Sequence, residues 1–361
     1  MKKLILRGCT RLSKILASLG NLKQLIQLDL NGCKCLKSLP NKISLEALEI
    51  FDLGGCSRLE KFPKIVENIP RLSKLYFNKT PIEDLPLLME HVVGLIELDP
   101  RDCKKISSPS NACCSLISLK IVTLSGCSKI DEFPKNLGNL ESLEELNVSG
   151  TAIKALPTSI KLLKNLKVLS LHGCEGLSPK SLNVLISFQR RRSLDPMVML
   201  EQSLSDFCSW TKLDLSFCNL QTIPDDIGYL SSLLELNLAG NYFVCLPKSM
   251  IQLSNLEILM LNFCTSLRSL PKLPLKIEVI GARCCTSLET LSIRPEDEFV
   301  LGLDLTNCVK LIANQENSDV LSGMLRRYII NYQVSLSLSL SLSLACDRGS
   351  KHYDFYVLET C

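Results

Sequence analysis

Aromatic and histidine side chains are scarce in this 361-residue sequence. Aromatic residues make up 5% of the chain, there is one tryptophan, and the only histidines are His91, His172 and His352. None of the eighteen cysteines forms a Cys-x-x-Cys pair. Zinc sites usually combine such pairs with further cysteines or histidines, so the sequence gives a zinc site little support. We expect no metal site and no cofactor.

The sequence also has no large excess of charge of one sign and no long apolar runs. The chain has 41 lysines and arginines against 37 acidic residues, a net charge of +4. This balance argues against nucleic acid or an anionic membrane as a partner. No run of about 18 apolar residues could span a bilayer, and the first residues lack the apolar core of a secretory signal. We therefore expect a cytoplasmic protein with reduced thiols, with the nucleus as a second possible compartment.

Leucine is the residue in excess, with 72 copies. The pattern is clearest in Leu25-Ile-Gln-Leu28-Asp-Leu30-Asn-Gly-Cys33, and it recurs every 21 to 24 residues apart from one step of 44. Thirteen such matches are the signature of leucine-rich repeats. The last position of the pattern, which we call the column, is occupied by Cys9, Cys33, Cys56, Thr80, Cys103, Cys127, Thr151, Cys174, Cys218, Asn241, Cys264, Cys285 and Cys308.

Each repeat begins with a short strand. Leu28 and Leu30 alternate with polar residues, which indicates a strand with one buried face. Thirteen parallel strands spaced by about 4.8 Å would form an inner sheet roughly 60 Å long. The column residue follows the strand, where its side chain can hydrogen-bond to buried backbone groups. We interpret the column cysteines as structural, with disulfide or metal chemistry as the alternative.

The second half of most repeats carries a Leu-Pro, Phe-Pro or Ile-Pro pair, as at Leu156-Pro157. Proline fixes φ and removes a hydrogen-bond donor, which favours extended backbone or short turns over long helices. The fold class expected is an α/β solenoid. It is a leucine-rich-repeat horseshoe of about 13 repeats, with a parallel concave sheet and a convex side of short turns or 3-10 segments.

The chain divides into three predicted regions. Residues 1–311 form the solenoid, within which 175–209 are either an insertion or a degenerate repeat. Residues 312–334 follow the repeats and could form a short helix, and 335–361 contain a low-complexity Ser-Leu tract and an unstructured tail. The first repeat starts at Met1 without a polar cap, so we expect a fragment or a truncated gene model.

Several repeats share a more specific form, Gly-Cys-(Ser/Thr) followed by Leu-Pro or Phe-Pro, as in Gly126-Cys127-Ser128-Lys-Ile-Asp-Glu-Phe133-Pro134. A related stretch is Leu146-Asn-Val-Ser-Gly-Thr151-Ala-Ile-Lys-Ala-Leu156-Pro157. These motifs resemble the leucine-rich-repeat region of plant TIR-type nucleotide-binding disease resistance proteins. The resemblance covers residues 1 to about 330.

The resemblance implies the recognition part of an intracellular innate immune receptor. Such a module would sense a pathogen effector, directly or through a guarded host protein, and would restrain the receptor's nucleotide-binding domain. The chain departs from the family in having no GxxxxGK[ST] phosphate loop, so no nucleotide site carries over. We expect no enzyme: any NADase or nucleotide-binding activity would belong to domains absent from this chain. The alternative is a stand-alone intracellular leucine-rich-repeat signalling scaffold.

Candidate partner-binding residues are those on the concave wall and its edge, where rings and arginines concentrate binding energy. They are Tyr76, Asp99, Arg101, His172, Asp214, Phe217, Tyr242, Phe243, Met260, Phe263 and Arg283. Phe217 and Phe263 stand where other repeats have glycine. Either these rings contact a partner or they fold over the edge of the repeat. Acidic strand residues suggest a partner with basic character; the alternative is that they are simply solvated strand residues.

Overall fold

The structure is a computed structural model, and it describes residues 1–40, 42–62, 64–65, 68–83, 91–107, 111–177, 209–292 and 302–313. Most of the predicted segments 175–209 and 312–334, and the whole of 335–361, lie outside the described residues.

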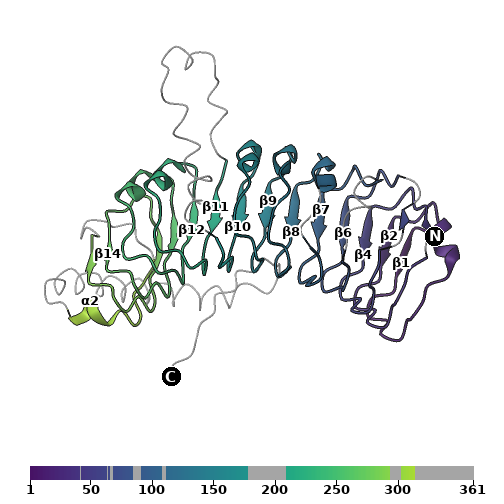
Figure 1. The fold of residues 1–361 in the computed structure, drawn as a ribbon, viewed down its shortest axis with the longest axis horizontal. Coiled ribbons are helices and arrows are strands. Elements are labelled where there is room, and N and C mark those ends of the chain that lie inside the picture. Colours follow the sequence, from purple (N-terminus) through teal and green to yellow (C-terminus); the bar gives the residue numbers. More distant parts are fainter. Residues whose placement is uncertain are drawn as a thin grey trace, which may run out of the picture.

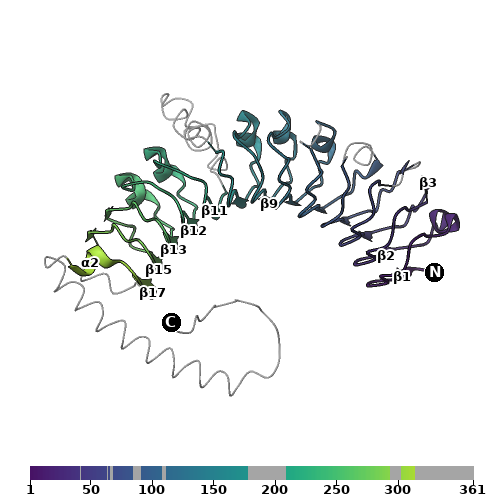
Figure 2. The ribbon, with the colours of Figure 1, turned by 60° about the horizontal axis from the view of Figure 1, so that its bottom comes forward.

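Thirteen short parallel strands form one sheet that lines the inner side of an arc (Figures 1 and 2). Their buried central residues lie side by side; Leu146, for example, pairs with Leu169. The expected solenoid with a parallel concave sheet is confirmed. The strands are β1 (Lys3–Ile5), β2 (Gln27–Asp29), β4 (Ile50–Asp52), β6 (Lys74–Tyr76), β7 (Glu97–Asp99), β8 (Ile121–Thr123), β9 (Glu145–Asn147), β10 (Val168–Ser170), β11 (Lys212–Asp214), β12 (Glu235–Asn237), β13 (Ile258–Met260), β15 (Val279–Gly281) and β17 (Gly302–Asp304).

The outer side of the arc consists of short segments, as the prolines predict. Pro157, Pro224 and Pro247 each stand immediately before a 3-10 turn, where an absent N–H costs nothing. The 3-10 turns are η1 (Ala17–Asn21), η3 (Asn111–Ser115), η4 (Leu137–Asn139), η5 (Thr158–Leu162), η9 (Asp225–Tyr229) and η10 (Lys248–Gln252). The remaining elements are the pairs β3 (Lys42–Ile43) with β5 (Lys64–Ile65) and β14 (Ser269–Leu270) with β16 (Thr290–Leu291), and the helix α2 (Val309–Ala313).

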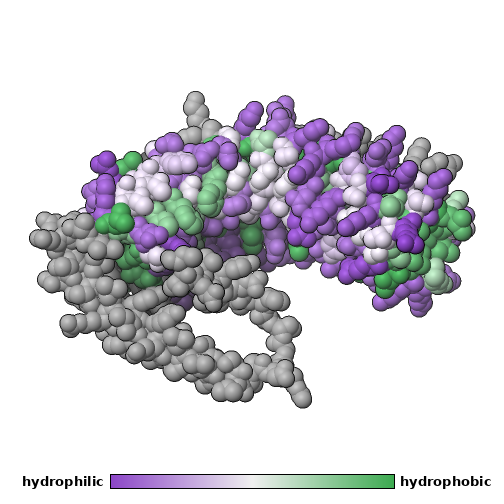
Figure 3. All heavy atoms as spheres, turned by 90° about the horizontal axis from the view of Figure 1, so that it is seen from below, coloured by the Kyte–Doolittle hydropathy of each residue, from purple (hydrophilic) through white to green (hydrophobic). Residues whose placement is uncertain are grey.

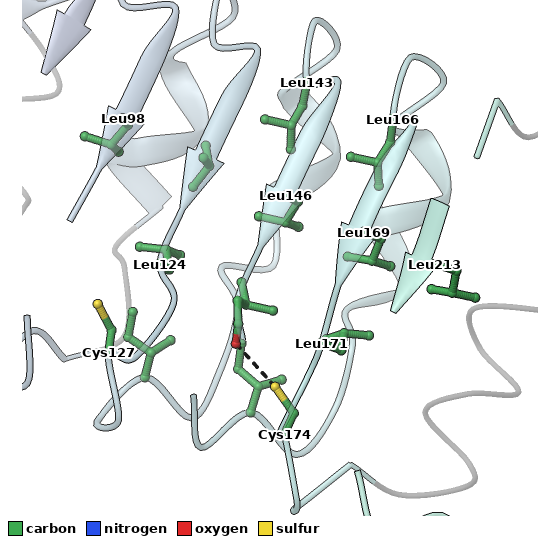
Figure 4. Close-up of a cluster of buried hydrophobic side chains, with 14 of the residues drawn as sticks. Leu98, Leu124, Cys127, Leu143, Leu146, Leu166, Leu169, Leu171, Cys174 and Leu213 are labelled. Carbon is green, nitrogen blue, oxygen red and sulfur yellow. Dashed lines mark hydrogen bonds between the residues drawn. The ribbon is translucent and has the colours of Figure 1, made fainter. Parts of the chain in front are cut away.

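Stacked leucines fill the space between the sheet and the outer turns (Figure 4). Leu143, Leu146, Leu166 and Leu169 are all buried; Leu143 lies beside Leu166, and Leu146 beside Leu169, its counterpart in the next repeat. The core is therefore continuous along the arc, and this continuous packing makes the concave face rigid. Hydrophobic residues also gather at the end of the molecule that carries β1 (Figure 3). β1 is an edge strand of the sheet and has a neighbouring strand, β2, on one side only.

Candidate partner-binding surface

From Cys33 to Cys308 the column residues are buried and their side chains hydrogen-bond to backbone carbonyls, whereas Cys9 in the first repeat is exposed. Cys127 Sγ donates to the Pro100 carbonyl of the preceding repeat over 3.1 Å, and Cys174 Sγ donates to the Val148 carbonyl over 3.3 Å (Figure 4). Thr80 and Thr151 supply a hydroxyl at the same place. Asn241 donates to two carbonyls, those of Leu215 and Leu238. Each side chain thus satisfies a backbone acceptor that water cannot reach.

Several of the buried column thiols are held in the unreactive, protonated form. Burial raises the pKa of Cys56, Cys127 and Cys218 to about 12, so these sulfurs stay protonated at neutral pH. Every cysteine within the described part of the chain is free of disulfides, and no group of side chains there could hold a metal ion. The described helices also include none that is long and apolar enough to cross a membrane.

The residue before each column position has a left-handed backbone. Glycine occupies this position in seven repeats, but Lys79, Asp102, Phe217, Phe263, Cys284 and Asn307 occupy it in the other six. The conformation directs the N–H toward the next repeat; Phe217 N, for instance, donates to the Ala239 carbonyl over 2.7 Å. A side chain at positive φ costs about 1–2 kcal/mol, and phenylalanine, unlike asparagine or aspartate, has no polar group that could offset this cost by a local hydrogen bond.

The acidic strand residues have a structural role that the sequence did not reveal. A side-chain oxygen of Asp99 accepts the N–H of Arg101 over 3.1 Å, and Asp214 accepts the N–H of Ser216 over 2.9 Å. Asn147 and Asn237 make the same bond in their own repeats. These oxygens hold the turn after each strand, so much of their hydrogen-bonding capacity is used within the protein.

Three of the candidate residues lie on β6 and β7 or just after them. Arg101 pairs with Asp99 through its Nε and Nη2 atoms, with an Nη2–Oδ2 distance of 2.8 Å. Tyr76 is half-buried, and its burial together with a hydrogen bond to Glu97 raises its pKa. This group is separated by β8 and β9 from the other candidate residues, so the structure does not form a single site from all of them.

Three other candidate rings form a continuous row, which we call the aromatic edge: His172, Phe217 and Phe263. The His172 and Phe217 rings meet edge to face at 5.4 Å, and those of Phe217 and Phe263 are 6.5 Å apart. The Phe217 ring lies over Gly240, where an added Cβ would overlap three ring carbons. The Phe217 and Phe263 side chains remain 43% and 48% exposed. The rings thus lie along the edge of the repeats and still present apolar surface to solvent.

Buried Ser216, which the sequence did not single out, positions the first ring of the aromatic edge. Its hydroxyl donates to Asp214 Oδ1 over 2.5 Å, and its oxygen lies 2.7 Å from His172 Nδ1. Because a hydroxyl has one proton, His172 must donate the second hydrogen bond. The chain of hydrogen bonds from Asp214 through Ser216 to His172 therefore fixes the orientation of the His172 imidazole beside Phe217.

Met260 and Arg283 lie next to the aromatic edge, on β13 and just after β15. The Met260 sulfur packs over Gly281, where a Cβ would come within 2.7 Å of it. The Arg283 N–H donates to Asn262 Oδ1 over 2.9 Å. Ile258 and Val279 are half-buried on the same strands, which makes this stretch of the concave face apolar.

Tyr242 and Phe243 are adjacent but lie in different environments. Tyr242 is 46% exposed, whereas Phe243 is fully buried in the core. The prediction that Phe243 belongs to an exposed contact surface is wrong. Phe243 stands two residues after its column residue, as the buried Ile82 and Ile153 do after Thr80 and Thr151, and this spacing was the available signal.

A cleft of about 540 Å³ also escaped the sequence reasoning. It is lined by Ser57, Lys79, Thr80, Pro81, Asp102, Lys104 and Lys105. Two of these residues, Lys79 and Asp102, have the left-handed backbone described above. The cleft and the aromatic edge therefore both include residues that replace glycine at this position.

Comparison with known families identifies the repeats. A model described as a leucine-rich repeat region matches residues 91–213, and a model described as a leucine rich repeat matches residues 209–265. Such solenoids typically serve as recognition scaffolds rather than as enzymes.

Among known proteins, the chain is similar to disease resistance-like protein DSC1 of Arabidopsis thaliana, with 37% identity over 90% of this chain. It is also similar to TMV resistance protein N of Nicotiana glutinosa, with 31% identity over 78% of this chain. The alignments span only 25% and 23% of the length of these two relatives.

Among solved structures, a leucine-rich-repeat protein of Leptospira interrogans superimposes with a TM-score of 0.52 at 22% identity, over 84% of this chain and 74% of that one. At this identity the likeness concerns the fold alone. The sequence relatives are more informative, because they cover most of the chain at higher identity. The chain belongs to the leucine-rich-repeat proteins, and over most of its length it is a relative of plant disease resistance proteins of the TIR-type nucleotide-binding class.

Proposed function

We propose that this chain is the recognition module of a cytoplasmic plant innate immune receptor. It senses a pathogen effector, either directly or through a guarded host protein. In the absence of that signal it restrains the receptor's nucleotide-binding domain. The observation that carries the proposal is the similarity to disease resistance proteins, which extends over 90% and 78% of the chain for the two relatives described above.

The physical properties of the solenoid support a recognition role. Its core is continuous, so side chains on the inner strands keep fixed positions relative to one another. A rigid surface loses little conformational entropy when a partner binds. The exposed members of the candidate set lie on this rigid frame: Arg101, His172, Phe217, Tyr242 and Phe263. Tyr76, Asp214, Met260 and Arg283 lie on it as well and are half-buried.

A chimaeric receptor tests the restraint. The repeats of TMV resistance protein N that align with this chain are replaced by residues 1–361, and the chimaera is expressed in leaves. We expect no cell death without an elicitor. A matched chimaera with Leu146→Asp, which places a charge at a buried core position, should cause cell death by itself. Equal behaviour of the two chimaeras would refute autoinhibition by the folded repeats.

Mapping the complete transcript of the locus separates this function from the alternative scaffold. A reading frame that encodes a TIR domain and a phosphate loop ahead of Met1 would support the receptor. A transcript whose coding sequence starts at Met1 under its own promoter would support a stand-alone scaffold instead.

A further inference from the structure

The aromatic edge has properties that folding does not require. Phe217 and Phe263 adopt φ values of 55° and 65°, where seven other repeats have glycine. Nearly half of each side chain is exposed. Bulky residues in a strained backbone conformation, with their rings in water, are a feature typical of functional sites. Exposed aromatic residues held on a rigid frame are also typical anchors for protein partners.

An apolar floor adjoins the aromatic edge. On β13 the central residue is buried while Ile258 and Met260 flank it on the concave side, and Val279 lies beside Ile258 on β15. The Met260 side chain packs over Gly281, and because glycine has no side chain, Met260 covers the floor at that position. The aromatic edge and this floor belong to the same repeats, because Phe263 follows β13 by three residues.

The same part of the concave face is acidic. The described side chains on the concave face and rim from β11 to β17 include five carboxylates and two cations: Asp214, Glu235, Glu257, Glu278 and Asp304 against Lys212 and Arg283. Lys212 is paired with Glu235 at 2.6 Å. Glu257 and Glu278 are neighbours on adjacent repeats, and within the described part of the chain neither forms an ion pair. Their charges are available to a partner.

We propose that the aromatic edge and the floor of β13 and β15 bind one segment of a partner protein that combines an apolar anchor with basic residues. An aromatic or aliphatic side chain of the segment packs on Phe217 and Phe263. Lysine or arginine side chains of the segment pair with Glu257 and Glu278. This inference rests on the proposed recognition function and specifies the chemistry of the partner.

The distance between the two subsites sets the length of the segment. Glu257 and Phe263 are six residues apart along a strand and its turn, which corresponds to at most roughly 20 Å at about 3.3 Å per residue of an extended strand. An extended segment of about six residues, or a helix of about thirteen, spans this distance. A peptide that carries both the anchor and the basic residues can therefore reach both subsites.

The probe is a phage-displayed library of random 12-residue peptides, selected on the immobilised full chain. Enriched peptides are synthesised with a fluorophore, and their dissociation constants are measured by fluorescence anisotropy at low and high salt. We expect an enriched motif with an aromatic or leucine residue and at least two lysines or arginines. We also expect binding that weakens several-fold between 50 and roughly 300 mM salt, because screening reduces the attraction of Glu257 and Glu278 for the basic residues.

Three variants test the contributions of the aromatic edge, of the two carboxylates and of an unrelated exposed ring to peptide binding. F217G/F263G introduces the residue that other repeats have at this position, and it should weaken binding at least tenfold. E257Q/E278Q should weaken binding several-fold and remove most of the salt dependence. Y229A, which removes a ring that is 43% exposed on the outer turn η9, is the matched control and should leave binding unchanged.

Circular dichroism and thermal melting establish that each variant is folded. If F217G/F263G is not folded, F217N/F263N replaces it, since Asn307 occupies the same left-handed position in the last repeat. The proposal is overturned if no peptide is enriched, if the enriched peptides lack basic residues, or if they bind the Phe217 and Phe263 variants within twofold of the original chain. A transcript without receptor domains would refute the proposed function but would leave this peptide result unchanged.

Discussion

Replacing Gly240 with alanine should destabilise the solenoid more than the same change at Gly150. Both glycines have a left-handed backbone, with φ of 66° and 64°. A Cβ at Gly150 would have its nearest neighbour 3.8 Å away, so Gly150→Ala carries only the backbone cost of about 1–2 kcal/mol. At Gly240 the new methyl would overlap the Phe217 ring and force it out of the aromatic edge.

The additional cost follows from the contacts that Phe217 would lose. Its ring packs on His172 and Phe263, and each aromatic pair contributes about 0.5–1.5 kcal/mol. We therefore expect Gly240→Ala to reduce the free energy of unfolding by about 2–5 kcal/mol, compared with about 1–2 kcal/mol for Gly150→Ala. The loss of unfolded-state entropy that alanine brings is common to both variants and cancels in the comparison.

Urea unfolding followed by circular dichroism measures both variants, and a double-mutant cycle isolates the ring. In a Phe217→Gly background, Gly240→Ala should cost no more than Gly150→Ala, because no ring remains to be displaced. The reasoning is refuted if the two alanine variants have equal midpoints in the original chain. It is also refuted if removing the Phe217 ring leaves the cost of Gly240→Ala unchanged.

Three further predictions concern the core, the turns and the column. Leu28→Asp should lower the urea midpoint strongly, by several kcal/mol in free energy, while Leu16→Asp at an exposed site should not; equal midpoints would contradict the buried strand face. Asp99→Ala should cost about 1 kcal/mol in thermal unfolding because it removes the acceptor for the Arg101 N–H, whereas Asp99→Asn should retain that acceptor, and a large loss in the asparagine variant would argue against this role. Stability should fall as pH rises from about 8.5 toward 12, because the unfolded chain releases thiol protons that the folded chain keeps. Cys127→Thr should make this fall in the melting temperature less steep, and an unaltered pH profile would count against a buried, protonated thiol.

The fold was predictable because leucine spacing reflects a requirement of every repeat. A buried strand face needs Leu28 and Leu30 at alternate positions, and the column needs a small side chain that can hydrogen-bond. These requirements recur thirteen times, so the pattern is clear despite single departures. The prolines predicted the short outer turns for the same reason.

The candidate surface was less predictable because it depends on the backbone path of individual turns. Tyr242 and Phe243 are adjacent rings, and only the position of the turn decides that one is exposed and the other buried. Similarly, the sequence gives no sign that Asp99 has a partner within the protein, but its Oδ1 atom accepts the N–H of Arg101 and so stabilises the turn after the strand. The contact between Phe217 and Phe263 spans two repeats, and no local spacing indicates it.

The identity of the column residue also determines how strongly consecutive repeats are tied together. A column cysteine such as Cys56 bonds back to the repeat before it, through the Leu30 carbonyl at 3.2 Å. Thr80 and Thr151 instead donate to Phe77 and Val148, which belong to their own repeats. The side-chain link to the previous repeat is therefore replaced at two points along the arc. We therefore expect these two repeat interfaces to act as boundaries during unfolding. Unfolding that starts at one end of the solenoid should stop there before the next group of repeats unfolds.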